Sequence, residues 1–93
     1  MLKLTNTERG VYVQGLLHPH KTMFVFNRLM QAYLQSTTSS TRRALIDLQK
    51  AIEDKYGAEV SFGALRKYAD GTTRTPNSVT LAAIAGTLLD LPK

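Results

Sequence analysis

The chain has 93 residues, a length that suits one small domain built around a single core. Twelve Lys and Arg residues against seven Asp and Glu give a net charge of +5, which favours an anionic partner. The absence of cysteine excludes disulfides, thiolate metal sites and cysteine nucleophiles. No apolar run is long enough to span a bilayer and no secretory leader pattern opens the sequence, so we expect a cytoplasmic protein with no membrane partner.

Residues 1–22 are predicted to form an arm ahead of the helical domain. Residues 10–17, GVYVQGLL, are rich in β-branched and aromatic side chains, which favours a strand, although two glycines weaken it. The polar break His18-Pro19-His20-Lys21 follows. Residues 22–26 either pair back on this strand as a hairpin or begin a helix. We therefore expect a short β arm or hairpin at the N-terminus.

Two helices are predicted in the middle of the chain. The first runs from about Met23 to Gln35, because its apolar residues recur at helical spacing. The second is capped by Ser39 or Ser40, reaches Tyr56 and is closed by Gly57. The predicted inward-facing residues are Phe26, Leu29, Met30, Tyr33 and Leu34 in the first helix and Leu45, Leu48, Ile52 and Tyr56 in the second.

A shorter helix is predicted over residues 61–70. The hydroxyl of Ser61 can accept from a backbone N–H of the first turn, which makes it a good N-cap. Leu65 and Tyr68 lie three residues apart and share one face, so the opposite face is offered outward. Gly71 ends the helix because glycine tolerates the left-handed conformation of a helix C-terminus.

The last predicted helix follows a polar turn. Residues 72–76, TTRTP, form the turn, and Pro76 is well placed just before or within a first helical turn. Asn77 or Ser78 caps the helix, which runs to about Leu89. Its predicted buried stripe consists of Leu81, Ile84, Ala85 and Leu88.

The segment from Val60 to Leu89 resembles the helix-turn-helix domains of phage repressors and their bacterial relatives, of the Cro and repressor type. The positions that carry the resemblance are Ser61, Leu65, Tyr68, Gly71, Pro76, Leu81, Ile84, Ala85 and Leu88. The resemblance implies an all-α helix-turn-helix bundle of about four helices over residues 23–93, with residues 61–70 as the recognition helix.

The upstream part departs from the family pattern. Ala58 and Glu59 lengthen the turn before the recognition helix by about two residues, as in those repressor-like regulators that carry a longer turn. If Ile52 is the apolar anchor of the preceding helix, Glu53 stands where a small residue usually lets the two helices touch. The crossing angle of the two helices is therefore left open by the sequence.

The resemblance also implies a set of DNA-contacting residues. A recognition helix enters the major groove by its N-terminal end, where Phe62, Gly63 and Arg66 are the first exposed positions. Arg66 is the best candidate for reading guanine, and Phe62 suits a thymine methyl group. The positions expected to add close backbone approach or phosphate contacts are Gly63, Lys67, Thr72, Thr73, Arg74, Asn77, Arg42, Arg43 and Ser61.

Catalytic and metal functions find little support in the sequence. His18 and His20 are two imidazoles without a nearby cysteine or carboxylate cluster, so a polar turn is expected there and not a zinc site. No arrangement of Ser, His and acid, no carboxylate pair and no glycine-rich phosphate loop stands out. We predict no enzyme, no metal and no cofactor.

Two functions remain open. The first is a sequence-specific transcriptional regulator that binds double-stranded DNA as a homodimer, with residues 11–17 and the apolar face of the helix over 23–35 as candidate dimer contacts. The alternative is a non-enzymatic module of the same helical fold that binds a protein partner, such as an adaptor or an antitoxin-like protein. The lengthened turn and Glu53 favour this alternative.

Overall fold

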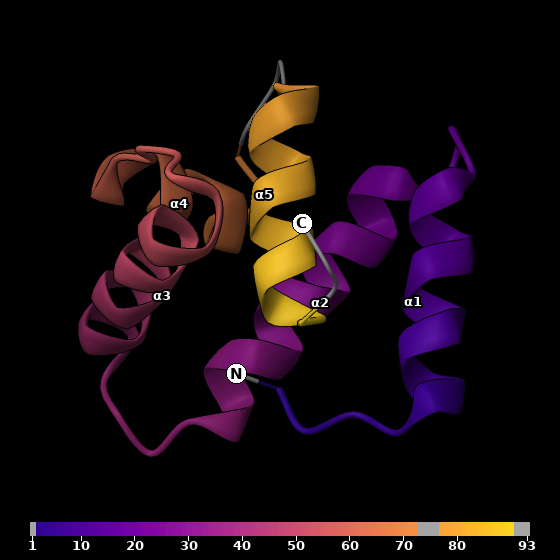
Figure 1. The fold of residues 1–93 in the computed structure, drawn as a ribbon, viewed down its shortest axis with the longest axis horizontal. Helices are drawn as coiled ribbons and strands as arrows, with labels where there is room; N and C mark the ends of the chain where they lie inside the picture. Colours follow the sequence, from indigo (N-terminus) through magenta and orange to yellow (C-terminus); the bar gives the residue numbers. More distant parts are fainter. Residues whose placement is uncertain (1, 73–76, 91–93) are drawn as a thin grey trace.

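Five helices, with no strand among them, make up the part of the chain that the computed structural model describes, residues 2–72 and 77–90. They are α1 (Asn6–Leu17), α2 (Thr22–Ser36), α3 (Thr41–Tyr56), α4 (Phe62–Asp70) and α5 (Ser78–Leu88). Figure 1 shows α5 in the middle of the molecule, with α1 on one side and α3 and α4 on the other. The predicted all-α fold is confirmed.

The predicted N-terminal β arm or hairpin is wrong, because residues 6–17 form a helix. Thr5 and Glu8 make a capping box in which the Thr5 hydroxyl accepts from the Glu8 N–H at 3.1 Å and the Glu8 carboxylate accepts from the Thr5 N–H at 3.3 Å. Tyr12, Val13 and Leu16 follow at helical spacing and pack against the core. Capping and this packing outweigh the strand preference of the β-branched residues.

The two middle helices form where the sequence predicts them. Ser40 caps α3 by accepting from the Arg43 N–H at 3.2 Å, and Gly57 ends it in the left-handed region at a φ of 65°. The structure buries most of the residues that are predicted to face inward in these two helices. They are Phe26, Leu29, Met30, Tyr33, Leu45, Leu48 and Ile52. Both helices therefore contribute buried side chains to the core, and α4 and α5 each pack on both of them.

Burial of α2 also removes one expected dimer contact. The apolar face of this helix is predicted to meet a second copy, but Phe26, Leu29 and Met30 each have 0% of their surface exposed within the single chain. The prediction is wrong because these side chains belong to the core of the same chain, in which α4 and α5 pack on α2.

Local signals fix both ends of α4 and the start of α5. Ser61 caps α4 by accepting from the Ala64 N–H at 3.1 Å, and Gly71 closes it at a φ of 73°. The Asn77 side chain caps α5 by accepting from the N–H groups of the next turn. Tyr68 of α4 packs edge-on against Phe26 of α2, with ring centroids 5.3 Å apart. These contacts hold α4 firmly against the core.

Candidate nucleic-acid interface

The long turn between α3 and α4 is anchored at its end. The side-chain amide of Gln49 in α3 donates to the Val60 carbonyl at 2.8 Å, and the Val60 side chain is buried. Glu53, predicted as a helix-contact position, is exposed. The two extra residues therefore leave the position of α4 well defined, because an internal hydrogen bond and a buried anchor fix the chain just before its first turn.

The polar face of α4 lies on the surface, as the residue spacing predicts. Leu65, Tyr68 and Ala69 are buried, whereas Gly63, Arg66 and Lys67 of the same helix are exposed and Phe62 is half-buried. At its far end the helix is tied to α2, because the Gln31 amide donates to the Ala69 carbonyl at 2.7 Å. A helix held at both ends presents its exposed side chains in one fixed orientation.

The structure brings a second arginine to this face. Arg42 and Ile46 of α3 line a depression of about 470 Å³ together with Phe62 and Arg66 of α4. Two arginines from different helices thus line one depression together with two apolar side chains. The sequence names Arg42 only as an additional phosphate contact and gives no sign that it lies near Arg66. That juxtaposition depends on how α3 and α4 cross.

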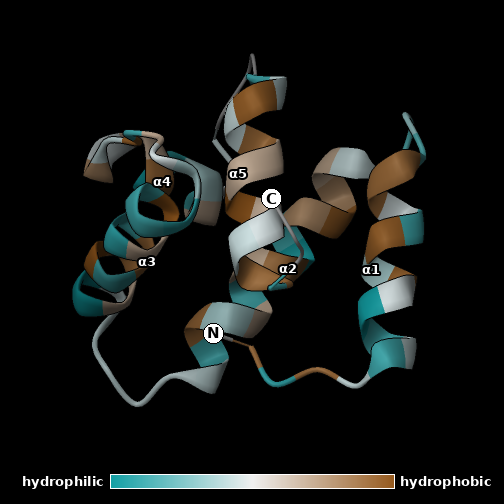
Figure 2. Ribbon diagram, viewed as in Figure 1, coloured by the Kyte–Doolittle hydropathy of each residue, from teal (hydrophilic) through white to brown (hydrophobic). Residues whose placement is uncertain are grey.

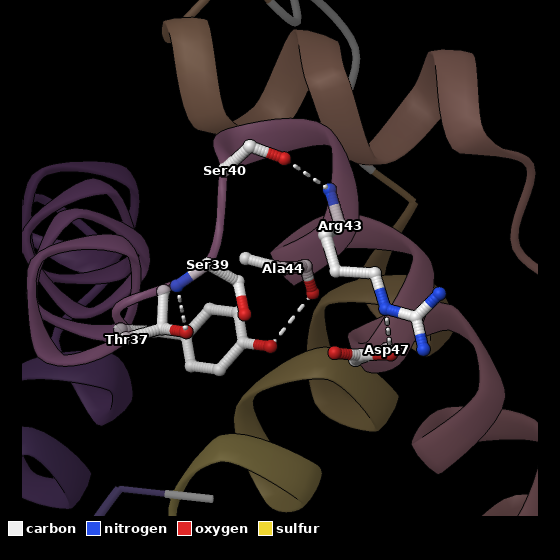
Figure 3. A network of polar contacts seen from close by, with 7 residues as sticks. Thr37, Ser39, Ser40, Arg43, Ala44 and Asp47 are labelled. Atoms are coloured by element: carbon white, nitrogen blue, oxygen red, sulfur yellow. Dashed lines mark hydrogen bonds and ion pairs between the residues drawn. The ribbon is translucent and has the colours of Figure 1, made fainter.

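Two of the candidate arginines form ion pairs one helical turn away. The Nε atom of Arg66 lies 3.5 Å from the Asp70 carboxylate, and that of Arg43 lies 3.3 Å from the Asp47 carboxylate. Figure 3 shows the second pair at the start of α3. All four side chains are substantially exposed, and such pairs contribute about 0–1 kcal/mol. Either arginine can therefore exchange its carboxylate for a phosphate or a base at little cost.

Three other predicted contacts have structural roles. The Asn77 side-chain oxygen and the Ser61 hydroxyl both accept from backbone N–H groups as helix caps. The Thr72 hydroxyl donates to the Lys67 carbonyl at 3.4 Å, just beyond α4. Thr73 and Arg74 lie outside the described residues.

An acidic flank borders the start of α4 on one side. Glu53 and Glu59 line a depression of about 440 Å³ together with Gln49 and Ser61. Negative charge here repels phosphate, so an approaching nucleic acid is favoured on the side of Arg42 and Arg66. The sequence shows both glutamates, but their position beside Ser61 follows only from the folded turn.

The described residues contain no group of three or more His, Cys, Asp or Glu side chains that is placed to hold a metal ion. The predicted turn at His18 to Lys21 connects α1 and α2, and the Thr22 hydroxyl donates to the carbonyls of Leu16 and His18 there. None of the described helices is both long enough and apolar enough to cross a bilayer.

Comparison of the chain with protein-family models, with curated proteins and with solved structures finds no match.

Proposed function

We propose that this protein is a sequence-specific binder of double-stranded DNA that inserts the N-terminal end of α4 into the major groove. The observation that carries the proposal is the convergence of Arg42 and Arg66 around Phe62 on the exposed side of a helix fixed at both ends. Arginine is the side chain best suited to bond two guanine acceptors at once, and an apolar ring suits a thymine methyl group. The net charge of +5 favours the approach of a polyanion.

The exposed residues divide into two roles under this proposal. Arg66 lies one turn into α4 and reads a base edge, whereas Lys67 and Arg43 contact phosphates and set the position of the helix. Arg42, on the neighbouring helix, neutralises the phosphate nearest to Arg66. Phosphate contacts supply affinity without sequence preference, and the base contact supplies the preference.

The short reading helix favours a dimeric regulator. With 9 residues, α4 offers few exposed side chains to the groove. Two copies related by a two-fold axis double the number of base contacts on a roughly palindromic site, with half-sites about one helical turn of DNA apart. A protein of this kind regulates transcription by occupying an operator.

Replacement of Arg66 and Lys67 by alanine, one at a time, tests these roles. Arg66→Ala is expected to weaken binding to the preferred site by about 1–3 kcal/mol and to relax the preference for one base pair. Lys67→Ala is expected to weaken binding to all sequences equally and to lower the salt dependence by about one counterion. Fluorescence anisotropy with labelled duplexes at several salt concentrations measures both effects.

Arg28→Ala is the matched control, because it removes the same charge from an exposed position on α2 where Arg28 lies over the Phe24 ring. It is expected to leave the sequence preference unchanged. If Arg66→Ala weakened binding to every duplex equally, Arg66 would not contact a base edge. If all three variants weakened binding to the same extent, the interaction would be nonspecific attraction between opposite charges.

The acidic flank supports a second candidate function, the binding of a protein partner. Glu53 and Glu59 border the same helix start and suit a basic peptide better than a phosphate. The two candidates differ in which replacement disrupts binding. A protein partner on this flank is lost when Glu53 and Glu59 are replaced by glutamine, whereas the same replacement is expected to strengthen binding to DNA.

A further inference from the structure

A broad apolar groove lies between α1 and α5, away from the residues proposed to contact DNA. It has a volume of about 710 Å³, and its lining includes Leu16 and Leu17 of α1, Tyr56 at the end of α3, and Val79, Ala82 and Gly86 of α5. No charged side chain of the described residues lines it. Figure 2 shows the apolar residues gathered in the C-terminal half of α1 and at the start of α5.

The helix α5 has no charged face but is covered on only part of its surface by the described residues. Its sequence, SVTLAAIAGTL, contains no charged residue. A helix without a polar face is normally buried all round. Here Ala83 to Leu88 are buried, but Val79 is 73% exposed and Ala82 is exposed beside it. Among residues 2–72 and 77–90, no element covers this side of α5.

The helix α1, on the opposite side of the groove, is also only partly covered by the described residues. It has no buried residue, and its main packing partner is α2. Leu17 at its C-terminal end is 71% exposed, directly on the rim of the groove. Leu17 and Val79 are thus two apolar projections beside one apolar hollow.

We propose that this groove is the contact between two copies of the chain. A two-fold interface sets one surface against itself, so the same surface must provide both the projections and the hollow that receives them. This surface has both. It also meets the electrostatic requirement, because two chains of charge +5 repel each other and can approach closely only through a face that places no like charges opposite one another.

The lining chemistry disfavours charged occupants. An acidic peptide or a phosphate finds no basic side chain among the lining residues, and a basic peptide finds no carboxylate. The dimer rests on the proposed function only in that it supplies the two-fold partner for a palindromic site. Its test needs no DNA, so failure of the dimer and failure of DNA binding are separate results.

Sedimentation equilibrium of the full chain tests the proposal, over a concentration range from about 1 μM to 1 mM. The chain is expected to pass from monomer to dimer within that range. Val79→Asp and Leu17→Lys are each expected to weaken the dimer at least about tenfold, because each places an unpaired charge in an apolar contact. Both substitutions suit their helices, since an acid is favourable in the first turn of α5 and a base in the last turn of α1.

Phe24→Asp is the control, because it places a charge on another exposed apolar residue, 64% exposed, outside the groove lining. It is expected to leave the dimer intact, and circular dichroism confirms that all variants are folded. A wild-type chain that stays monomeric throughout the range overturns the proposal. A dimer that survives Val79→Asp and Leu17→Lys unchanged overturns it equally, because its contact lies elsewhere.

Discussion

Tyr33 is the residue at which a single hydroxyl joins two helices of the core. Its ring belongs to the buried face of α2, and its hydroxyl donates to the Ala44 carbonyl of α3 at 2.7 Å. Burial raises the pKa of this phenol above its ordinary value, and the nearby Asp47 carboxylate raises it further. The folded chain therefore holds this proton to higher pH than the unfolded chain does.

The raised pKa predicts a loss of stability at high pH. The contribution is complete below pH about 10, where the tyrosine of the unfolded chain begins to ionise, and it declines as pH rises further. Tyr33→Phe is expected to cost about 0.5–1.5 kcal/mol at neutral pH and to make the decline above pH 10 shallower. Urea unfolding of both proteins between pH 7 and 11 measures the difference, and parallel curves would contradict the assignment.

Some features of the candidate site can be predicted from the sequence and others cannot. The cap at Ser61 and the exposure of Arg66 and Lys67 follow from spacing alone, because a cap and the face of a helix are set by residues within one or two turns. Arg42 as a neighbour of Arg66 is not readable in this way, since it depends on the contact of two helices. The sequence predicts Asn77 both as the cap of α5 and as a phosphate contact. Only the hydrogen bonds show that its side-chain oxygen is already occupied by the cap.

Element boundaries follow local signals more faithfully than composition. The helices α3 and α4 start at a serine cap and end at a left-handed glycine, as the sequence predicts. For α1 the β-branched residues indicate a strand, while the Thr-x-x-Glu pattern at Thr5 and Glu8 indicates a helix start. The structure follows the cap, because a strand needs a partner and the other described elements are all helices.

The contact between α3 and α5 depends on a glycine. A Cβ atom at Gly86 of α5 would overlap the Tyr56 hydroxyl at the end of α3, and no other side chain comes within 3.4 Å of that position. Glycine is thus needed at position 86 only to make room for the Tyr56 side chain. Without that requirement alanine is the better residue, because glycine lowers the stability of a helix interior by about 1 kcal/mol relative to alanine.

This geometry predicts that the effect of Gly86→Ala changes sign with the residue at position 56. In the wild-type background the substitution is expected to destabilise the fold by about 1–3 kcal/mol, because Tyr56 must move. In a Tyr56→Ala background it is expected to stabilise the fold by up to about 1 kcal/mol through helix propensity. Thermal or urea unfolding of the four proteins completes a double-mutant cycle. Equal effects in both backgrounds would show that another contact limits the glycine.

At the scale of the whole molecule, the faces of the fold are divided between two tasks. Arg42 and Arg66 gather where α3 meets α4, and the apolar groove lies between α1 and α5. Figure 1 places α1 and the pair α3 and α4 on opposite sides of α5. Under the two proposals, the surface where α3 meets α4 binds DNA and the groove between α1 and α5 joins the second copy.

The sequence predicts this arrangement only in part. The helical bundle and the exposed face of α4 follow from apolar periodicity and caps. The groove does not, because it exists only once residues 6–17 form a helix that stands beside α5. From the sequence, the apolar face of α2 is a reasonable candidate for a dimer contact, because the sequence does not show whether other helices of the same chain cover it. The structure shows that this face is buried.

The most direct test of the central claim is selection of binding sites by the purified protein from a pool of randomised duplex DNA, at two salt concentrations. The proposed function predicts enrichment of a short two-fold symmetric motif, with affinity that falls as salt rises because bound phosphates release counterions. Salt-sensitive retention of the pool with no enriched motif would contradict sequence-specific reading by α4. It would leave the acidic flank beside Ser61 as the better guide to function.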